Sequence, residues 1–374
     1  MAGRLQLRRG VVVSAEPLEV DIDGVHRRAW ADKVLLGEMS EGDEVVVNVA
    51  ALDLDLGSGG FDVVHVNLTR GLEGGGEGDV HVMKLNYTSL QHPIEPVERE
   101  VGRLMSDIQP KVAVLVLPLH GHLAPAAWAA AQAAPGLRVG YVQTGGGALP
   151  GSFSRDVKQL RERELLYGHI TAAPAYGGEL EALSAVGALD GAANELGWEA
   201  ILVGPGPGII GSDTTYGHGG IAALDSAHAA LSLNFPTQIS PRLSSRDPRA
   251  RHRGLSHHTR TVLDLLLAPV DIALPEGASE IAAALEVSPH RVQQVPADLG
   301  GYAAADLPAT TMGRSLYDDP LFFAAPLAAG RLPARSQRTV PCAARTAPKK
   351  AEPAVHGHRD QAAGTYCCGQ TRRR

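Results

Sequence analysis

The stretch KVAVLVLPL, from Lys111 to Leu119, decides the fold class of this chain. Its apolar residues follow one another without the alternation that marks a strand with one face in water. A continuous Val/Leu run of this kind is typical of a strand that is buried on both faces in a parallel sheet. The sequence around it therefore predicts a sheet that is covered on both sides.

Helical and strand-like segments alternate on the C-terminal side of this run. We expect a helix to Ala134 and then strands at 138–144, 170–174, 200–203, 237–240 and 270–274, separated by helices at 155–166, 180–196, 221–233 and 259–267. The strand at 270–274 is expected to be the last. This alternation predicts an α/β fold with a doubly wound, mostly parallel sheet.

The first 88 residues have a different pattern. Short Val-rich runs recur about every ten residues and are separated by turn sequences such as Asp23-Gly24 and Gly57-Ser58-Gly59-Gly60. This spacing predicts a small N-terminal β barrel or sandwich. The expected organisation is a small β domain at 1–88, an α/β domain with the ligand site at 89–330, and a tail at 331–374.

The tail is basic, with ten Lys and Arg residues against two Asp and Glu, and it holds all three cysteines (Cys342, Cys367 and Cys368). Without apolar periodicity it is expected to be disordered, and its origin is either native or a shifted reading frame. The preceding 330 residues carry a net charge of −15. That charge argues against nucleic acid as a partner for the body and leaves it open only for the tail.

The composition is that of a globular protein, with 44% apolar and 20% charged residues in 374. The apolar run Val11–Val13 is too short for a signal-peptide core, and Pro118 and Pro125 break the only stretch long enough to suggest a membrane span. We therefore expect a cytoplasmic protein that does not enter a membrane. The sequence leaves the oligomeric state open.

Three loops follow expected strands, where ligands of parallel sheets bind. The first contains His120 and His122, which are candidate ligands of a divalent metal ion or ordinary loop side chains. The second contains Gly145, Gly146 and Gly147, whose backbone N–H groups could converge on an anion or simply form a tight turn. Its spacing matches neither a P-loop nor a dinucleotide fingerprint.

The third loop runs from Gly204 to Gly220 and combines stiff prolines with glycines and short polar side chains. Its candidate substrate-binding residues are Gly206, Gly208, Gly211, Ser212 and Thr214, and Asp213 is a candidate catalytic carboxylate. The alternative is that one of the polar residues caps the following helix. A long polar loop of this kind favours a functional role.

The densest signal is the segment from Arg242 to Thr259, which holds five arginines and three histidines. Arg251 and Arg253 are candidate ligands for a carboxylate or phosphate, because guanidinium groups bind both bidentately. Ser256 is a good helix N-cap, so His257 and His258 would lie in a first helical turn as candidate catalytic acid/base groups or metal ligands. The alternative is a salt-bridged surface loop.

At these loops the sequence resembles a bacterial family described only as domain of unknown function 3866. The resemblance rests on TGGGALP (144–150), GPGIIGSDT (206–214), DPRARHRGLSHHT (247–259) and TMGRSLYDDPLFF (311–323), and it covers roughly residues 5–330. It implies a shared fold and a shared site, and no particular activity.

The leading hypothesis is an enzyme that acts on a small anionic substrate, phosphorylated or carboxylated, with histidine acid/base or metal chemistry. The alternative is a non-catalytic metabolite-binding or regulatory module that uses the same anion site. A third interpretation is nucleic-acid binding through the basic tail. Whether the chain is catalytic at all is left open by the sequence.

Overall fold

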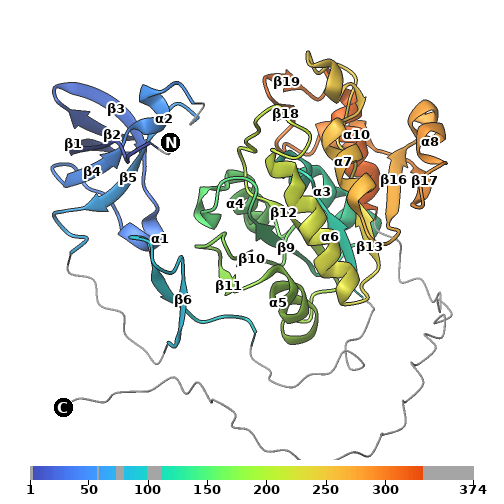
Figure 1. Cartoon of the computed structure of the whole chain (residues 1–374), viewed down its shortest axis with the longest axis horizontal. Coiled ribbons are helices and arrows are strands. Elements are labelled where there is room, and N and C mark those ends of the chain that lie inside the picture. Colours follow the sequence, from blue (N-terminus) through green and yellow to red (C-terminus); the bar gives the residue numbers. More distant parts are fainter. Residues whose placement is uncertain (1–2, 57–58, 73–79, 99–111, 332–374) are drawn as a thin grey trace, which may run out of the picture. The chain divides into compact units, whose positions relative to one another are not determined.

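The computed structural model of the chain describes residues 3–56, 59–72, 80–98 and 112–331 (Figure 1). The predicted basic tail lies outside these described residues, apart from Arg331. Its disorder, its partners and the expected domain limits stay predictions.

The N-terminal segment forms a closed five-stranded barrel, which confirms the expected small β fold. The strands pair in the order β1-β2-β3-β5-β4, and only β3 and β5 run parallel to each other. Val45 and Val47 alternate with more exposed neighbours and are completely buried in the barrel core. The barrel elements are β1 (Leu7–Ala15), β2 (Leu18–Ile22), β3 (Val25–Trp30), α1 (Lys33–Leu36), β4 (Glu44–Asn48), α2 (Ala50–Asp53) and β5 (Asp62–Asn67).

A short antiparallel hairpin follows the barrel in the chain. It consists of β6 (Val82–Lys84) and β7 (His92–Ile94), and it spans the predicted domain limit at residue 88.

The C-terminal segment forms an eight-stranded sheet in which every neighbouring pair is parallel, so the expected α/β fold is confirmed. The strand order is β11-β10-β9-β12-β8-β13-β16-β17, which places the first strand, β8, near the centre. The strands are β8 (Ala113–Val116), β9 (Val139–Thr144), β10 (Gly168–Ala172), β11 (Leu180–Ala182), β12 (Ala200–Pro205), β13 (Thr237–Ile239), β16 (Asp271–Pro275) and β17 (Arg291–Val295).

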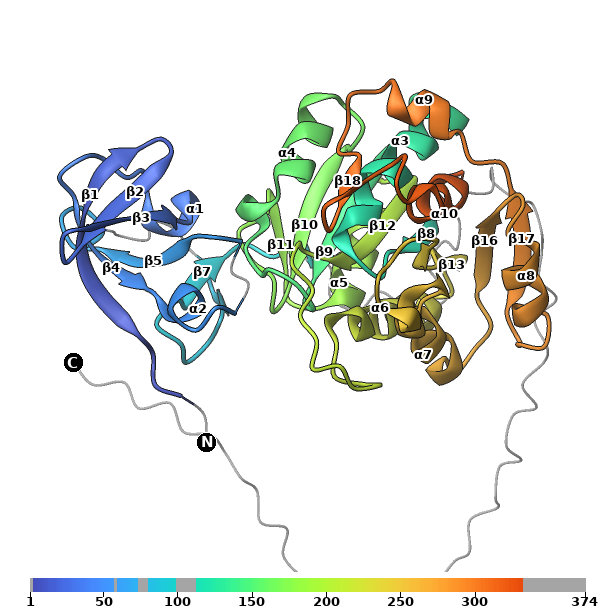
Figure 2. The same ribbon diagram turned by 90° about the horizontal axis from the view of Figure 1, so that it is seen from above.

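The central strand β8 explains the apolar run from which the fold class was predicted. Val114 and Val116 belong to one core cluster, whereas Leu115 and Leu117 belong to another. Successive side chains of a strand point to opposite faces, so both faces of β8 are covered. Helices lie on the two sides of the sheet in Figure 2.

The helices divide between these two faces. One face carries α5 (Ala185–Asp190), α6 (Ala222–Ser232) and α7 (His257–Leu265), and the other carries α3 (Leu123–Ala133), α4 (Arg155–Glu162), α9 (Leu299–Ala303) and α10 (Pro320–Gly330). The short α8 (Ser279–Leu285) connects β16 and β17. None of the helices among the described residues has the length and apolar character needed to cross a bilayer.

Two details of the expected order are wrong. Residues 180–182 form the edge strand β11 rather than the start of a helix, and the helix begins only at Ala185. The strand at 271–275 is not the last, because β17 pairs with it. Both strands missed in the eight-stranded sheet lie at its edges, where a strand is short or faces solvent and so lacks a continuous apolar run. The sequence of β17, RVQQV, is largely polar.

A close approach between Trp198 and two strands accounts for two of the glycines. Trp198 is buried against β9 and β10. A Cβ atom at Gly140 would lie 1.9 Å from the Trp198 Cε3 atom, and one at Gly168 would lie 2.7 Å from its Cζ2 atom. Only glycine leaves room for the indole ring at these positions.

Candidate functional site

Three neighbouring strands end beside one cavity. The strands β12, β8 and β13 are adjacent in the sheet, and the loops after their carboxyl ends carry His218, His120 and Arg242 respectively. In parallel α/β sheets this edge is where ligands bind. The cavity has a volume of about 320 Å³.

The cavity wall is rich in imidazole and guanidinium groups. Its titratable and charged lining residues are His120, His218, His252, His257, His258, Arg242, Arg249, Arg251 and Asp213. The structure therefore brings the predicted residues Asp213, Arg251, His257 and His258 into one cavity, as the hypothesis of a single site requires.

The N-terminus of α7 positions two of the histidines. Ser256 caps the helix, and its Oγ atom accepts a hydrogen bond from the backbone N–H of His258 at 3.2 Å. This confirms the predicted cap and sets His257 and His258 in the first turn. The Ser256 Oγ atom also lies 2.7 Å from Nδ1 of His252, the last residue of η6 (Ala250–His252), which fixes a third ring beside them.

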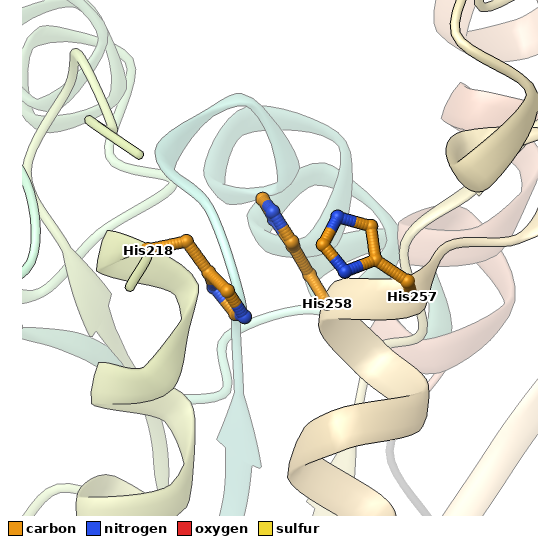
Figure 3. Close-up of side chains that lie close together, drawn as sticks. All are labelled: His218, His257 and His258. Atoms are coloured by element: carbon orange, nitrogen blue, oxygen red, sulfur yellow. The ribbon is translucent and has the colours of Figure 1, made fainter. Parts of the chain in front are cut away.

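Four imidazole rings pack against one another. The rings of His218 and His258 are stacked, with centroids 3.7 Å apart and an angle of 8° between the planes. The ring of His257 lies 4.3 Å from that of His258, and His252 lies 4.9 Å from His257. Figure 3 shows His218 approaching from one side and the pair at the start of α7 from the other.

Burial and neighbouring charges keep this cluster neutral. Burial, with help from His218 and Arg242, lowers the pKa of His258 to about 2, and burial together with Arg242 and Arg249 lowers that of His252 to about 3. Burial is also the main cause of the lowered pKa values of His218 and His257. Each imidazole therefore keeps an unprotonated nitrogen at neutral pH.

Behind the cavity wall, one buried carboxylate holds two of the arginines. Asp247 has no solvent exposure and accepts hydrogen bonds from Arg249 at 3.0 Å and from Arg242 at 3.3 Å. Burial and the charge of Arg249 lower the pKa of Arg242 to about 10, so its guanidinium stays charged at neutral pH. Arg314 also approaches Asp247, at 3.6 Å.

The predicted pair Arg251 and Asp213 lies at the exposed side of the cavity. The two side chains form an ion pair, in which Asp213 is 78% exposed and Arg251 is 37% exposed. Asp213 has a φ angle of 59°, in the left-handed region that aspartate tolerates better than most residues. Its catalytic role stays a prediction, because in this position its carboxylate neutralises a guanidinium.

The predicted glycines divide into two groups. Gly208, Gly211 and Thr214 line the cavity, whereas Gly145, Gly146, Gly147, Gly206 and Ser212 do not.

Close backbone packing explains the glycines outside the cavity. A Cβ atom at Gly147 would lie 2.0 Å from the carbonyl oxygen of Gly206, and one at Gly219 would lie 1.8 Å from that of Gly146. These glycines let the two loops pack directly on each other, so the structure gives them a packing role. Anion binding by them stays a prediction. Ser212 is bonded within its own loop, to the oxygens of Thr214 and Gly217.

Arg253, the second predicted anion ligand, lies outside this cavity lining. Its Nε atom donates to the backbone oxygen of Asp247 at 2.9 Å. The guanidinium of Arg253 therefore supports the loop that holds Asp247, while Arg251, two residues earlier, reaches the cavity.

The predicted metal ligands His120 and His122 have separate hydrogen-bond partners. Nε2 of His120 lies 2.8 Å from the Ser154 hydroxyl, and Nδ1 of His122 lies 2.9 Å from the Ser240 hydroxyl. Both rings are buried, but only His120 lines the cavity. Metal binding by this pair stays a prediction.

Four of the charged or titratable lining residues were not among the candidates from the sequence: His218, Arg242, Arg249 and His252. Three of them lie in the segment 242–259, so its high content of arginine and histidine correctly indicated where the site lies. His218 follows a glycine-rich run and carries no signal of its own. Only the neighbouring position of β12 and β8, together with the docking of α7, brings it to the site.

Comparisons with known proteins identify a family for the chain. No curated protein matches the sequence significantly. The crystal structure of YjeQ from Thermotoga maritima is 9% identical, with 70% of this chain and 67% of that chain covered, but its TM-score is 0.15 and it supports no argument. The family model described as "Protein of unknown function (DUF3866)" matches residues 28–330, which include the whole cavity lining. The chain therefore belongs to the DUF3866 family, as the resemblance of its loop motifs predicted.

Proposed function

We propose that this protein is an enzyme that acts on a small anionic substrate, phosphorylated or carboxylated, in the cavity at the ends of β8, β12 and β13. One observation carries the proposal. Three arginines and five histidines line a single cavity of about 320 Å³, against one lining carboxylate.

The charge of the cavity favours an anion. Arg242, Arg249 and Arg251 bring three positive charges to its wall, against Asp213 in the lining and the buried Asp247 behind it, so the wall keeps a net positive charge. The histidines add no charge at neutral pH, because burial lowers their pKa values. The body of the chain carries a net charge of −15, so this positive cavity contrasts with its surroundings.

The size of the cavity restricts the ligand to a small molecule. Pockets for small ligands have volumes of roughly 300–1,000 Å³, so the volume here is at the lower end of that range. Such a space accommodates a phosphorylated or carboxylated metabolite but not a folded partner. Guanidinium groups bind either kind of anion in a planar, bidentate manner.

The chemistry would come from the imidazoles. The Nε2 atom of His257 is buried and lacks a hydrogen-bond partner among the described residues, and the same is true of both ring nitrogens of His218. A neutral imidazole beside a bound anion can accept a proton or coordinate a metal ion. We therefore assign the acid/base or metal role to His257 with His258 and His218, and the substrate-binding role to Arg251.

Two arginines of the same segment provide a matched test. In calorimetric titrations with inorganic phosphate, Arg251→Ala should weaken binding five- to tenfold, since a partly exposed charge-assisted hydrogen bond contributes about 1–1.5 kcal/mol. Arg246→Ala removes the same charge from an exposed residue outside the cavity lining and should leave the affinity within twofold of the wild type. If the two substitutions weakened phosphate binding equally, the binding would reflect nonspecific charge attraction, and the proposal would be wrong.

Turnover separates an enzyme from a sensor. A panel of phosphate monoesters and carboxylic esters is incubated with the wild type and with His257→Gln, and released phosphate, alcohol or acid is measured. Product that depends on His257 supports the enzyme. Tight binding of a panel member without product, with or without added divalent metal ions, would establish a metabolite-binding module instead.

A further inference from the structure

Three imidazoles converge from two separate parts of the chain. His218 precedes α6, and His257 with His258 begins α7. One ring nitrogen of each lies within 4.8 Å of the others (Figure 3). Nothing in the sequence links His218 to the other two, so the convergence comes from the packing of α6 beside α7.

The ring nitrogens of this cluster are largely unsatisfied. Both nitrogens of His218 and the Nε2 atom of His257 are buried without a hydrogen-bond partner in the described part of the chain. His218 as a whole is only 7% exposed. Buried polar atoms are almost always paired, so several unpaired ring nitrogens gathered in one cluster indicate an occupant that bonds to them.

The donor set defines which metal would fit. Imidazole nitrogens suit zinc, copper, nickel and iron, whereas magnesium and calcium require oxygen ligands. The cluster offers three nitrogens and no carboxylate or thiolate. Three protein ligands with a fourth position left for water or substrate is the pattern of catalytic rather than structural zinc sites.

We propose that His218, His257 and His258 form the binding site of a divalent first-row transition metal ion, most suitably Zn²⁺, with an open coordination position facing the cavity. This site deepens the proposed function, since it assigns the histidines of the same cavity to a cofactor. It differs from the pair predicted from the sequence, His120 and His122, whose partnered nitrogens face two different serine hydroxyls.

Metal binding requires the three imidazole rings to reorient. Zinc–nitrogen bonds of about 2.0–2.1 Å in a tetrahedral site place the ligand atoms about 3.3 Å apart. The ring nitrogens, now separated by up to 4.8 Å, would have to approach one another, and the rings of His218 and His258 would have to leave their stacked arrangement. His258 gives up a weak contact in the process, because its Nδ1 atom accepts from Arg242 at 3.3 Å, beyond the usual range.

The nearby guanidinium groups repel a metal ion, because they are positively charged themselves. Arg242, Arg249 and Arg251 all line the same cavity. Their charge would weaken metal binding unless an anion or hydroxide occupies the open position, which is the position that the proposed substrate would take. We therefore expect micromolar rather than picomolar affinity for Zn²⁺ alone.

The test measures the metal alone. The full-length chain carries Cys342→Ser, Cys367→Ser and Cys368→Ser to exclude thiolate ligands, is stripped with a chelator, and is titrated calorimetrically with Zn²⁺. We expect one Zn²⁺ per chain and an affinity at least tenfold lower after His218→Ala, His257→Ala or His258→Ala. The control His26→Ala removes a 62% exposed histidine in β3 and should bind as the parent does.

Cobalt substitution supplies a second readout. Co²⁺ bound by three imidazoles gives visible absorption bands of a low-coordinate ion without the thiolate charge-transfer band. Those bands should disappear in the three histidine variants. Where an alanine variant does not fold, as judged by circular dichroism, the corresponding glutamine variant replaces it, because glutamine keeps much of the volume without an imidazole.

The outcomes separate this inference from the proposed function. Absence of Zn²⁺ binding, or binding unchanged by loss of all three histidines, would overturn the metal site even if phosphate binds through Arg251. Zinc binding that depends on the three histidines supports the metal site even if phosphate does not bind in the presence of chelator.

Discussion

The carboxylate of Asp247 and the guanidinium of Arg249 form a two-point ion pair, with Nε–Oδ1 and Nη2–Oδ2 distances of 3.0 Å. The carboxylate is completely buried, while Arg249 reaches from it to the cavity wall. The buried carboxylate of Asp247 thus fixes the position of the Arg249 guanidinium at the wall of the candidate site. Burial alone raises the pKa of Asp247, but the hydrogen bonds and charge of Arg249 outweigh it and hold the pKa below its usual range.

Replacing this carboxylate should be costly. Asp247→Asn leaves the buried Arg242 without its counter-charge, and breaking a buried pair lowers the free energy of unfolding by about 3–5 kcal/mol. Urea unfolding of the variant measures the loss. The control Asp271→Asn breaks the more exposed pair with Arg291 and should cost less than about 1 kcal/mol. Equal losses would show that the buried ion pair of Asp247 contributes no more to the free energy of unfolding than the exposed pair of Asp271.

Asp213 should compete with an anionic ligand for Arg251. Asp213→Asn frees the guanidinium, and an exposed ion pair contributes up to about 1 kcal/mol, so phosphate should bind up to about fivefold more tightly. Calorimetric titration with phosphate tests this directly. Weaker binding in the variant would instead mean that Asp213 holds Arg251 in its binding position. The same variant also tests the predicted catalytic role, since a catalytic carboxylate affects turnover rather than affinity.

The close approach of Trp198 predicts opposite effects for two glycine substitutions. Gly140→Ala would place Cβ 1.9 Å from the indole ring, so it should destabilise the protein by about 1–3 kcal/mol or more through overpacking. Gly300→Ala, in α9, meets nothing closer than 3.9 Å and should be neutral or stabilising. Thermal unfolding of both variants gives the comparison. An unchanged stability of Gly140→Ala would contradict the close packing of Trp198 on β9.

Stability should fall in mild acid because His169 stays neutral in the folded state. Burial, with His120 and Arg161 nearby, lowers its pKa to about 3. Above the usual value of 6.5 both states are neutral, but below it the unfolded chain binds a proton that the folded chain excludes. The free energy of unfolding therefore declines by about 1.4 kcal/mol per pH unit for each such histidine.

The variant His169→Gln isolates this contribution. Glutamine does not titrate, so the loss of stability between pH 7.5 and pH 5 should be smaller than in the wild type by about 2 kcal/mol. Urea unfolding at both pH values provides the measurement. If the free energy of unfolding fell equally with pH in the two proteins, His169 would take up its proton as readily in the folded chain as in the unfolded chain.

The sequence predicted most of the fold because burial leaves a local pattern. The Val/Leu run at 111–119 is continuous because β8 is covered on both faces, and helices such as α4 and α7 alternate buried apolar with exposed polar residues. The edge strands β11 and β17 were missed for the converse reason. One is three residues long and the other is largely polar, so neither carries a pattern strong enough to distinguish it from a helix or a loop.

By itself the sequence determined the fold class, the family and the segments that contain the candidate site, because the Arg/His density of residues 242–259 is a local property. It also located the helix cap at Ser256. Which residues meet was decided only by the tertiary structure. The strand order places β12 beside β8, and β8 beside β13, although β8 is far from both in the chain, so His218 comes to stack on His258. No local sequence pattern predicts this contact, because it depends on the packing of strands and helices that are far apart in the sequence.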